Sequence, residues 1–315
     1  MSQQLESTLK KIPILRQIVI VLQSIKLSWL QGLSLYELLE FYIAGIVQGA
    51  LAYRAAAISW SFFMALFPFA LFILNLIPYI PIEGFQEDFL FFVSDAVPPN
   101  TYEAIETIIK DILHNSYKGL LSSGFILSVF LMTNGVNAVM SGFETSQHIV
   151  VKRKYFRQYF VALCISLLLS FILIVAVASI IIFEVFIQKT IIQDVLSSRI
   201  SDKISLIQFG RYIFVLALII FAIAILFRFG IKQTKKRAFI TIGTVFTTIL
   251  IIVTSYFFGI WVVKFSKYNE LYGSIGTLLI VMFYLWINCM ILLLGFELDA
   301  AIAKLKHHPE VNPQL

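Results

Sequence analysis

The residues best suited to chemistry are polar side chains inside long apolar runs. One run carries Asn134, Asn137, Ser141 and Glu144 at three- and four-residue spacing, with His148 after them. This spacing places the groups on one face of a helix. Two interpretations follow: the face lines a hydrated path for a polar solute, or its side chains hold neighbouring helices together by hydrogen bonds.

Two further runs repeat the theme. Arg54 and Asn75 are separated by multiples of seven residues, which places them near one face of the first apolar helix. The last run carries Glu297 near its end, and Asp299 follows directly after it. We therefore expect a substrate path lined by the second-run face, with contributions from the first run: Asn134, Asn137, Ser141, Glu144, Arg54, Asn75. Proton coupling through Glu144 or Glu297 stays open.

Residues for catalysis or metal binding are sparse. The chain has four His, which are scattered, and two Cys, which lie in apolar runs and are interpreted as small buried hydrophobes. It contains no P-loop, no Gly-x-Ser-x-Gly elbow and no His-Glu-x-x-His motif. The sequence thus predicts no enzymatic activity, no metal site and no cofactor.

The composition of the chain indicates which class of protein these residues belong to. Of the 315 residues, 59% are apolar and 13% are charged, whereas about 25% are charged in soluble domains. So few charges cannot cover the surface of a soluble protein of this size. The surplus apolar surface is expected to face lipid.

Runs of about 20 apolar residues are long enough to cross a bilayer as helices. Six such runs occur, and none shows the alternation of a barrel strand. The sequence predicts an all-α polytopic membrane protein with six transmembrane helices. The predicted spans are Ile58–Ile80, Leu120–Met140, Tyr159–Phe183, Arg211–Phe229, Ala238–Val263 and Ile275–Leu298.

The distribution of Lys and Arg predicts the orientation. Counted by connecting segment, sixteen lie on the side of both termini and eight on the other side. The positive-inside rule then places both termini in the cytoplasm. Insertion and attraction to anionic lipid headgroups account for the net charge of +6, so we expect membrane lipids, and no nucleic acid, as partners.

The predicted organisation has three parts. Residues 1–57 form an interfacial helical segment, in which residues 12–30 make an amphipathic helix and Ser34–Ala57 a helix continuing into the first span. Residues 58–303 form the transmembrane domain, whose outer loop 81–118 is acidic and partly helical, with Asn100 capping a helix. Residues 304–315 form a cytoplasmic tail.

Two segments carry a resemblance to a known family. They are ALAYRAAAISWSFFMALFP at residues 50–68, and YGSIG at 272–276 together with LGFELD at 294–299. These segments resemble the opening and closing signatures of the YihY/BrkB family of bacterial inner-membrane proteins. The resemblance implies a multi-pass protein of the plasma membrane. Members of that family have been labelled ribonuclease BN, linked to virulence, or suspected of transporting envelope components.

Three functions are weighed. The first is transport or flipping of an amphipathic or lipid-derived solute along the polar face. The second is a membrane scaffold that acts through the acidic outer loop or through small residues at Gly45, Gly49, Ala52 and Ala56. The third is the ribonuclease label, which the lack of clustered His and Asp opposes. Substrate identity and oligomeric state do not follow from the sequence.

Overall fold

The computed structural model describes residues 13–26, 34–48, 50–76, 85–96, 106–107, 109–111, 118–146, 148–149, 153–193, 200–232, 238–264 and 274–307. Within these ranges the chain is helical, apart from turns, short connections and one isolated antiparallel bridge between Lys26 and Ser34. The predicted all-α class is confirmed.

Six helices of the described chain are long and apolar enough to cross a membrane, which confirms the predicted number of spans. Their apolar residues surround the helix axis because the helix surface faces lipid as well as protein. The six are α4 (Leu51–Leu76), α7 (Lys118–Glu144), α8 (Tyr155–Gln193), α9 (Ile200–Phe229), α10 (Ile242–Lys264) and α12 (Ser274–His307).

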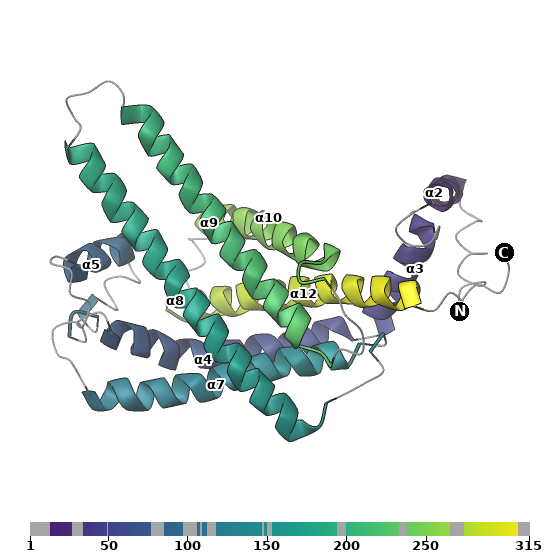
Figure 1. Cartoon of the computed structure of the whole chain (residues 1–315), viewed down its shortest axis with the longest axis horizontal. Helices are drawn as coiled ribbons and strands as arrows, with labels where there is room; N and C mark the ends of the chain where they lie inside the picture. The colour runs from purple at the N-terminus through teal and green to yellow at the C-terminus, as the bar shows by residue number, and fades with distance from the viewer. Residues whose placement is uncertain are drawn as a thin grey trace.

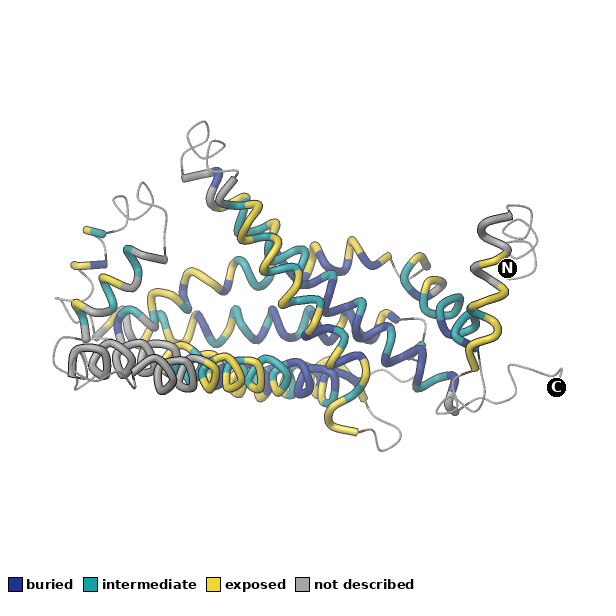
Figure 2. Tube along the Cα trace, turned by 90° about the horizontal axis from the view of Figure 1, so that it is seen from above, coloured by how far each residue is buried: buried dark blue, intermediate teal, exposed yellow. Residues whose placement is uncertain are grey.

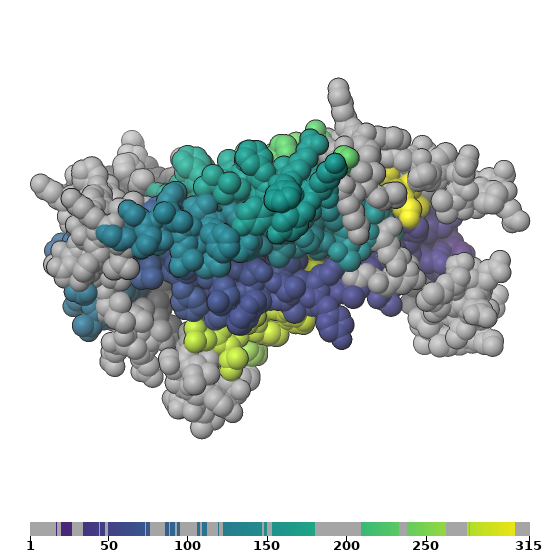
Figure 3. Space-filling view, turned by 90° about the horizontal axis from the view of Figure 1, so that it is seen from below, coloured from purple at the N-terminus to yellow at the C-terminus, as the bar shows by residue number. Residues whose placement is uncertain are grey.

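The six helices form two groups. Helix α4 packs against α7 and α12, and α12 also packs against α10; the space-filling view shows α4 exposed between its neighbours (Figure 3). Helices α8 and α9 form an antiparallel hairpin that crosses the first group obliquely, with α8 against α7 (Figure 1). With 39 residues, α8 is about 58 Å long at ~1.5 Å per residue. It is therefore longer than a perpendicular crossing requires.

Two shorter helices precede the first span. Helix α2 (Pro13–Ser24) falls within the predicted amphipathic segment. Helix α3 (Leu35–Gln48) begins with a capping box, in which Glu37 Oε2 accepts the Ser34 backbone N–H at 2.7 Å and the Glu37 N–H donates to Ser34 Oγ at 3.3 Å. The paired side chains satisfy two backbone donors that the helix start would leave free.

The prediction of one helix over Ser34–Ala57 running into the first span is wrong. Helix α3 ends at Gln48, and Ala50 has a left-handed φ of 47°. A left-handed residue ends one helix and lets the next start in a new direction. Helix α4 starts at Leu51, where Tyr53 and Arg54 donate their N–H groups to the Ala50 carbonyl. The first spanning helix thus begins seven residues before the predicted Ile58 and includes Arg54.

The small-residue face proposed for this region is also only partly correct. Gly45 packs against His148 and Glu297, whereas Ala52 and Ala56 are exposed. Gly49 lies outside the described residues. The turn at Ala50 explains the difference, because it rotates the two helices relative to each other.

The acidic outer loop contains one helix whose bounds were not predicted, α5 (Phe85–Ala96). Residues 106–107 and 109–111 are helical, as predicted for the second half of the loop. The predicted cap, Asn100, lies outside the described residues.

Buried residues gather toward one end of the bundle, where α3, the start of α4 and the end of α12 lie (Figure 2). We call this the α3 end. Its centre is an aromatic cluster of Phe143, Phe227 and Phe296, in which the rings of Phe143 and Phe296 stack at 3.9 Å between centroids. This cluster joins α7, α9 and α12. The excess of Lys and Arg makes the α3 end the predicted cytoplasmic end.

Candidate functional site

A buried ion pair lies at the α3 end, next to the aromatic cluster. The Arg54 side chain of α4 donates from Nη2 to Glu297 Oε1 of α12 at 2.7 Å, and the two side chains are 8% and 0% exposed. Arg54 also donates from Nη1 to the Gly142 carbonyl of α7 at 2.8 Å. Charges are stable at this depth only when they are paired, so these bonds fix α4, α7 and α12 to one another.

The second carboxylate oxygen of Glu297 faces the segment that follows α7. It accepts a hydrogen bond from Ser146 Oγ at 2.7 Å and lies 4.0 Å from Nε2 of His148. Neither Glu297 nor Ser146 belongs to the predicted substrate path. The sequence pointed to Glu297 because a carboxylate inside an apolar run is unusual. Nothing in the sequence pointed to Ser146 as a functional residue.

His148 occupies a slot between α3 and α12. Its ring stacks on Phe41 with 4.5 Å between centroids, its side chain is 4% exposed, and neither ring nitrogen has a hydrogen-bond partner. Burial lowers the pKa of His148, an effect opposed by Glu297 and reinforced by Lys304. Burial therefore favours the neutral imidazole over the imidazolium.

Helix α3 covers this network. Tyr42 donates its hydroxyl to the Leu294 carbonyl of α12 at 3.1 Å, and burial together with the Glu297 charge raises the pKa of Tyr42 to about 12. Below it, Leu38 packs against Ile302 and Leu305 near the end of α12. The slot is thus covered by one short helix.

The predicted polar face of α7 meets α8. Gln158 Nε2 donates to Asn137 Oδ1 at 3.1 Å and to Ser141 Oγ at 2.9 Å, and Tyr159 donates its hydroxyl to Asn134 Oδ1 at 3.2 Å. The side chains of Asn134 and Asn137 are half-buried and Ser141 is exposed. These groups therefore lie at the edge of the bundle, at the α7–α8 contact.

The polar contact continues toward the other end of α7. Thr133 and Ser166 share a hydrogen bond at 3.1 Å between their hydroxyl oxygens, and Ser170 donates to the sulfur of Met132 at 3.2 Å. We call the paired residues of this contact the α7–α8 polar ladder; they are Met132, Thr133, Asn134, Asn137 and Ser141 on α7 with Gln158, Tyr159, Ser166 and Ser170 on α8.

Glu144, the last residue of α7, leaves the face of the polar ladder. It is buried and accepts the Arg153 backbone N–H at 3.2 Å, while Arg153 Nη2 donates to the Ile231 carbonyl at 2.6 Å. Burial lowers the pKa of Arg153 and the Glu144 charge opposes this. Together the two residues tie the end of α7 to the start of α8 and the end of α9.

Asn75 lies apart from the other predicted site residues. It is separated from Arg54 by 21 positions of one helix, or about 31 Å at ~1.5 Å per residue. Its Nδ2 donates to the Leu71 carbonyl of its own helix at 2.8 Å, and its Oδ1 has no partner. The structure therefore does not bring Asn75 to the network of Arg54.

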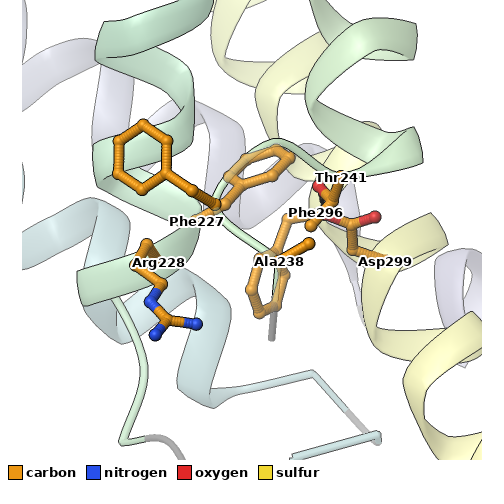
Figure 4. A pocket seen from close by; sticks show the side chains of 7 residues that line it. Phe227, Arg228, Ala238, Thr241, Phe296 and Asp299 are labelled. Atoms are coloured by element: carbon orange, nitrogen blue, oxygen red, sulfur yellow. Dashed lines mark hydrogen bonds between the residues drawn. The ribbon is translucent and has the colours of Figure 1, made fainter. Parts of the chain in front are cut away.

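Asp299 has a structural environment of its own (Figure 4). It accepts the backbone N–H of Gly243 at 2.7 Å and a hydrogen bond from Thr241, at the start of α10. Gly243 and Gly295 let α10 and α12 approach closely, because a Cβ on Gly295 would lie 1.6 Å from Thr247 Oγ1. Asp299 thus fixes the crossing of two helices. The nearby Arg228 side chain points away from it (Figure 4).

Metal ligation finds no support in the described part of the chain, where no group of three or more His, Cys, Asp or Glu side chains comes together. The ionisable side chains that meet at the described site are those of Arg54, Glu297 and His148. Ser146 donates a hydrogen bond to Glu297 from its hydroxyl.

Comparisons with known proteins identify the family of the chain. The model of the family described as virulence factor BrkB matches residues 43–314. A putative ribonuclease-like protein, YfkH of Bacillus subtilis, is 27% identical over 263 residues, which cover 82% of this chain and 93% of the relative. A UPF0761 membrane protein of Coxiella burnetii is 23% identical over 258 residues, which cover 80% and 88%. No solved structure matches the chain.

Proposed function

Because the chain belongs to the virulence factor BrkB family and is a multi-pass protein of the bacterial inner membrane, we propose that it moves an amphipathic, lipid-derived envelope solute across that membrane. The observation that carries the proposal is the α7–α8 polar ladder. A row of amide and hydroxyl groups between two helices, exposed at Ser141 and buried at Thr133 and Ser166, offers hydrogen bonds to a headgroup while the acyl chains stay in the bilayer.

The length of the ladder fits a partial crossing. From Met132 to Ser141 it extends over nine residue-to-residue steps of α7, or about 14 Å at ~1.5 Å per residue. The hydrocarbon core is about 30 Å thick, so the ladder reaches roughly halfway from the α3 end. A headgroup bound along it is sheltered over the first half of the crossing.

In the structure the groups of the ladder bond to one another, so transport requires the α8–α9 hairpin to move away from α7. Interhelical hydrogen bonds in membranes contribute about 0.6 kcal/mol each on average. The five bonds of the ladder therefore contribute only a few kcal/mol to holding the hairpin, and a headgroup replaces them as it enters. Arg54 and Glu297 keep α4, α7 and α12 together as the fixed part.

The test is a reversible lock on the hairpin. The hydroxyl oxygens of Thr133 and Ser166 lie 3.1 Å apart, so replacement of both residues by Cys brings two sulfur atoms to neighbouring positions across the α7–α8 contact. The double variant, with Cys164 and Cys289 replaced by Ala, is reconstituted into vesicles of phosphatidylethanolamine and phosphatidylglycerol. Movement of a fluorescent phosphatidylethanolamine between leaflets is followed by bleaching of the outer leaflet.

We expect the oxidised double variant to stop moving lipid and the same protein to regain movement when reductant is added. The single variants Thr133→Cys and Ser166→Cys are the matched controls, because they keep movement under oxidant. Lipid movement that persists in the oxidised double variant would contradict the proposal that the headgroup passes along the α7–α8 polar ladder.

The second candidate function is that of a membrane scaffold. The hydrogen bonds of the α7–α8 polar ladder favour it if they hold the two helices together permanently. It predicts that no vesicle assay shows lipid movement, and that cross-linking in cells captures a stable envelope partner.

The ribonuclease function remains a third candidate because one relative is named ribonuclease-like. We rank it last and propose that the chain has no nuclease activity and binds no nucleic acid. Release of 3′ nucleotides from tRNA by the pure protein with a divalent metal would contradict this.

A further inference from the structure

His148 is a titratable group with a buried side chain that the proposed path does not use. Its ring lies between Phe41 of α3 and Glu297 of α12, and Gly45 leaves room for it. Both ring nitrogens lack partners. Because a buried polar group without a hydrogen bond costs free energy, an imidazole kept in such a slot is not there for stability alone.

The charges around the slot decide which form of the imidazole it accepts. Helix α12 contributes Glu297 and Lys304, α4 contributes Arg54, and α3 contributes the neutral Tyr42. Glu297 is already shared between Arg54 and Ser146, while Lys304 lies over the outer ring of the stack, 5.3 Å from the centroid of Phe41. A cationic imidazole thus meets the charge of Lys304 and a carboxylate that Arg54 and Ser146 already engage.

The ring can gain a proton at low cost only outside the slot, where water solvates the imidazolium. Leaving the slot breaks the stack with Phe41 and removes the residue that packs on Gly45, so α3 loses its contact with the segment after α7. Helix α3 then keeps the hydrogen bond of Tyr42 and its apolar contacts, among them those of Leu35 and Leu38 with the end of α12.

We propose that His148 is a proton-binding site that holds α3 over the Arg54–Glu297 pair when neutral and releases α3 when it takes up a proton. The proton binds to a ring nitrogen of His148, and no other bond forms or breaks covalently. The inference goes beyond the proposed function and does not depend on it, because it concerns the position of α3 and not the passage of a solute.

The test measures the position of α3 directly. Nitroxide labels at Val47→Cys on α3 and Thr145→Cys after α7 report the distance between the two elements; both positions are exposed. Cys164 and Cys289 are replaced by Ala, and the protein is held in nanodiscs. The distance between the two nitroxide labels is measured by double electron–electron resonance spectroscopy. It is compared at about pH 8 and about pH 5, on either side of the ordinary histidine pKa of ~6.5.

We expect a single short distance at the higher pH and a longer component that grows severalfold at the lower pH. In the His148→Gln variant the pH response is lost, because glutamine does not titrate. The matched control is His307→Gln at the end of α12, which keeps the response. Identical distances at both pH values in the protein with His148, or a full response in the glutamine variant, would overturn the proposal. The readout needs no transport, so its failure is distinct from failure of the proposed function.

Discussion

Gly45 and His148 fit together so closely that a Cβ atom on residue 45 would lie 2.7 Å from Nε2 of the imidazole. They belong to different elements, α3 and the segment after α7, and they meet because Ala50 turns α4 away from α3. Through this contact a glycine in a short helix sets the position of a histidine beside the buried carboxylate of Glu297.

Replacing Gly45 by Ala tests this contact. The new methyl group displaces a ring that is fixed by its stack with Phe41. Overpacking costs about 1–3 kcal/mol, which exceeds the gain of up to ~1 kcal/mol from the better helix propensity of Ala. We expect a lower midpoint of thermal unfolding in detergent. Gly124→Ala on α7 is the control, because nothing lies within 4 Å of its added Cβ; an equal loss in both variants would contradict the explanation.

The buried Arg54–Glu297 pair predicts that a variant lacking one of the two charges loses much more folding stability than a variant lacking both. Glu297→Gln leaves the Arg54 cation buried without its partner and is expected to cost about 3–5 kcal/mol. The double variant Arg54→Met and Glu297→Met removes both charges and is expected to recover most of that loss. Unfolding of all three proteins by denaturant in detergent gives the comparison.

The exposed pair of Glu106 and Lys110, with N and O at 2.7 Å, is the control for burial. Its removal is expected to change stability by at most about 1 kcal/mol, because water solvates each charge left alone. A double variant at Arg54 and Glu297 as unstable as Glu297→Gln would contradict the desolvation argument.

The α7–α8 polar ladder predicts an order of effects. Gln158→Leu removes the hydrogen bonds to both Asn137 and Ser141, whereas Asn137→Leu removes one and leaves the other. At about 0.6–2 kcal/mol for each interhelical bond, the Gln158 variant is expected to be the less stable in a thermal unfolding series. Ser123→Ala, whose hydroxyl bonds only to its own helix, serves as reference. The reverse order would mean that Gln158 does not hold the two helices together.

The pKa of His148 predicts how stability depends on pH. Burial lowers this pKa in the folded protein, so the unfolded chain binds a proton more readily than the folded chain does. The stability contributed by the neutral ring is therefore fully present above the unfolded pKa of ~6.5 and is lost as the pH falls below it. We expect the thermal midpoint to drop between about pH 7 and about pH 5, and His148→Gln to reduce that drop. A drop of equal size in the variant would assign it to other groups.

Much of the architecture follows from the amino-acid sequence. The six runs of apolar residues are long and contain few charges, so each is stable only as a helix in a bilayer, and all six spans are found. The helix of the N-terminal segment was also predicted, because its apolar residues recur with the helical period. The break before α4 was not, since Ala50 is a good helix former and its left-handed conformation depends on what α3 and α4 pack against.

The site divides in the same way. The spacing of Asn134, Asn137 and Ser141 determined that they share one face of α7, because helical geometry is local. Spacing could not determine whether that face meets water, lipid or another helix, and the structure places it against Gln158 and Tyr159 of α8. The sequence likewise offered Asn75 and Arg54 as one group, although about 31 Å of helix separates them at ~1.5 Å per residue.

The sequence by itself determined that this is a membrane protein of six helices with polar groups at membrane depth, because composition and hydrophobic length act through the solvent and need no knowledge of contacts. Only the tertiary structure decided that Glu297 binds Arg54, 243 positions away along the chain, and that His148 lies beside them. A buried charge takes the partner that packing brings within hydrogen-bond distance, and that choice depends on how all the helices cross.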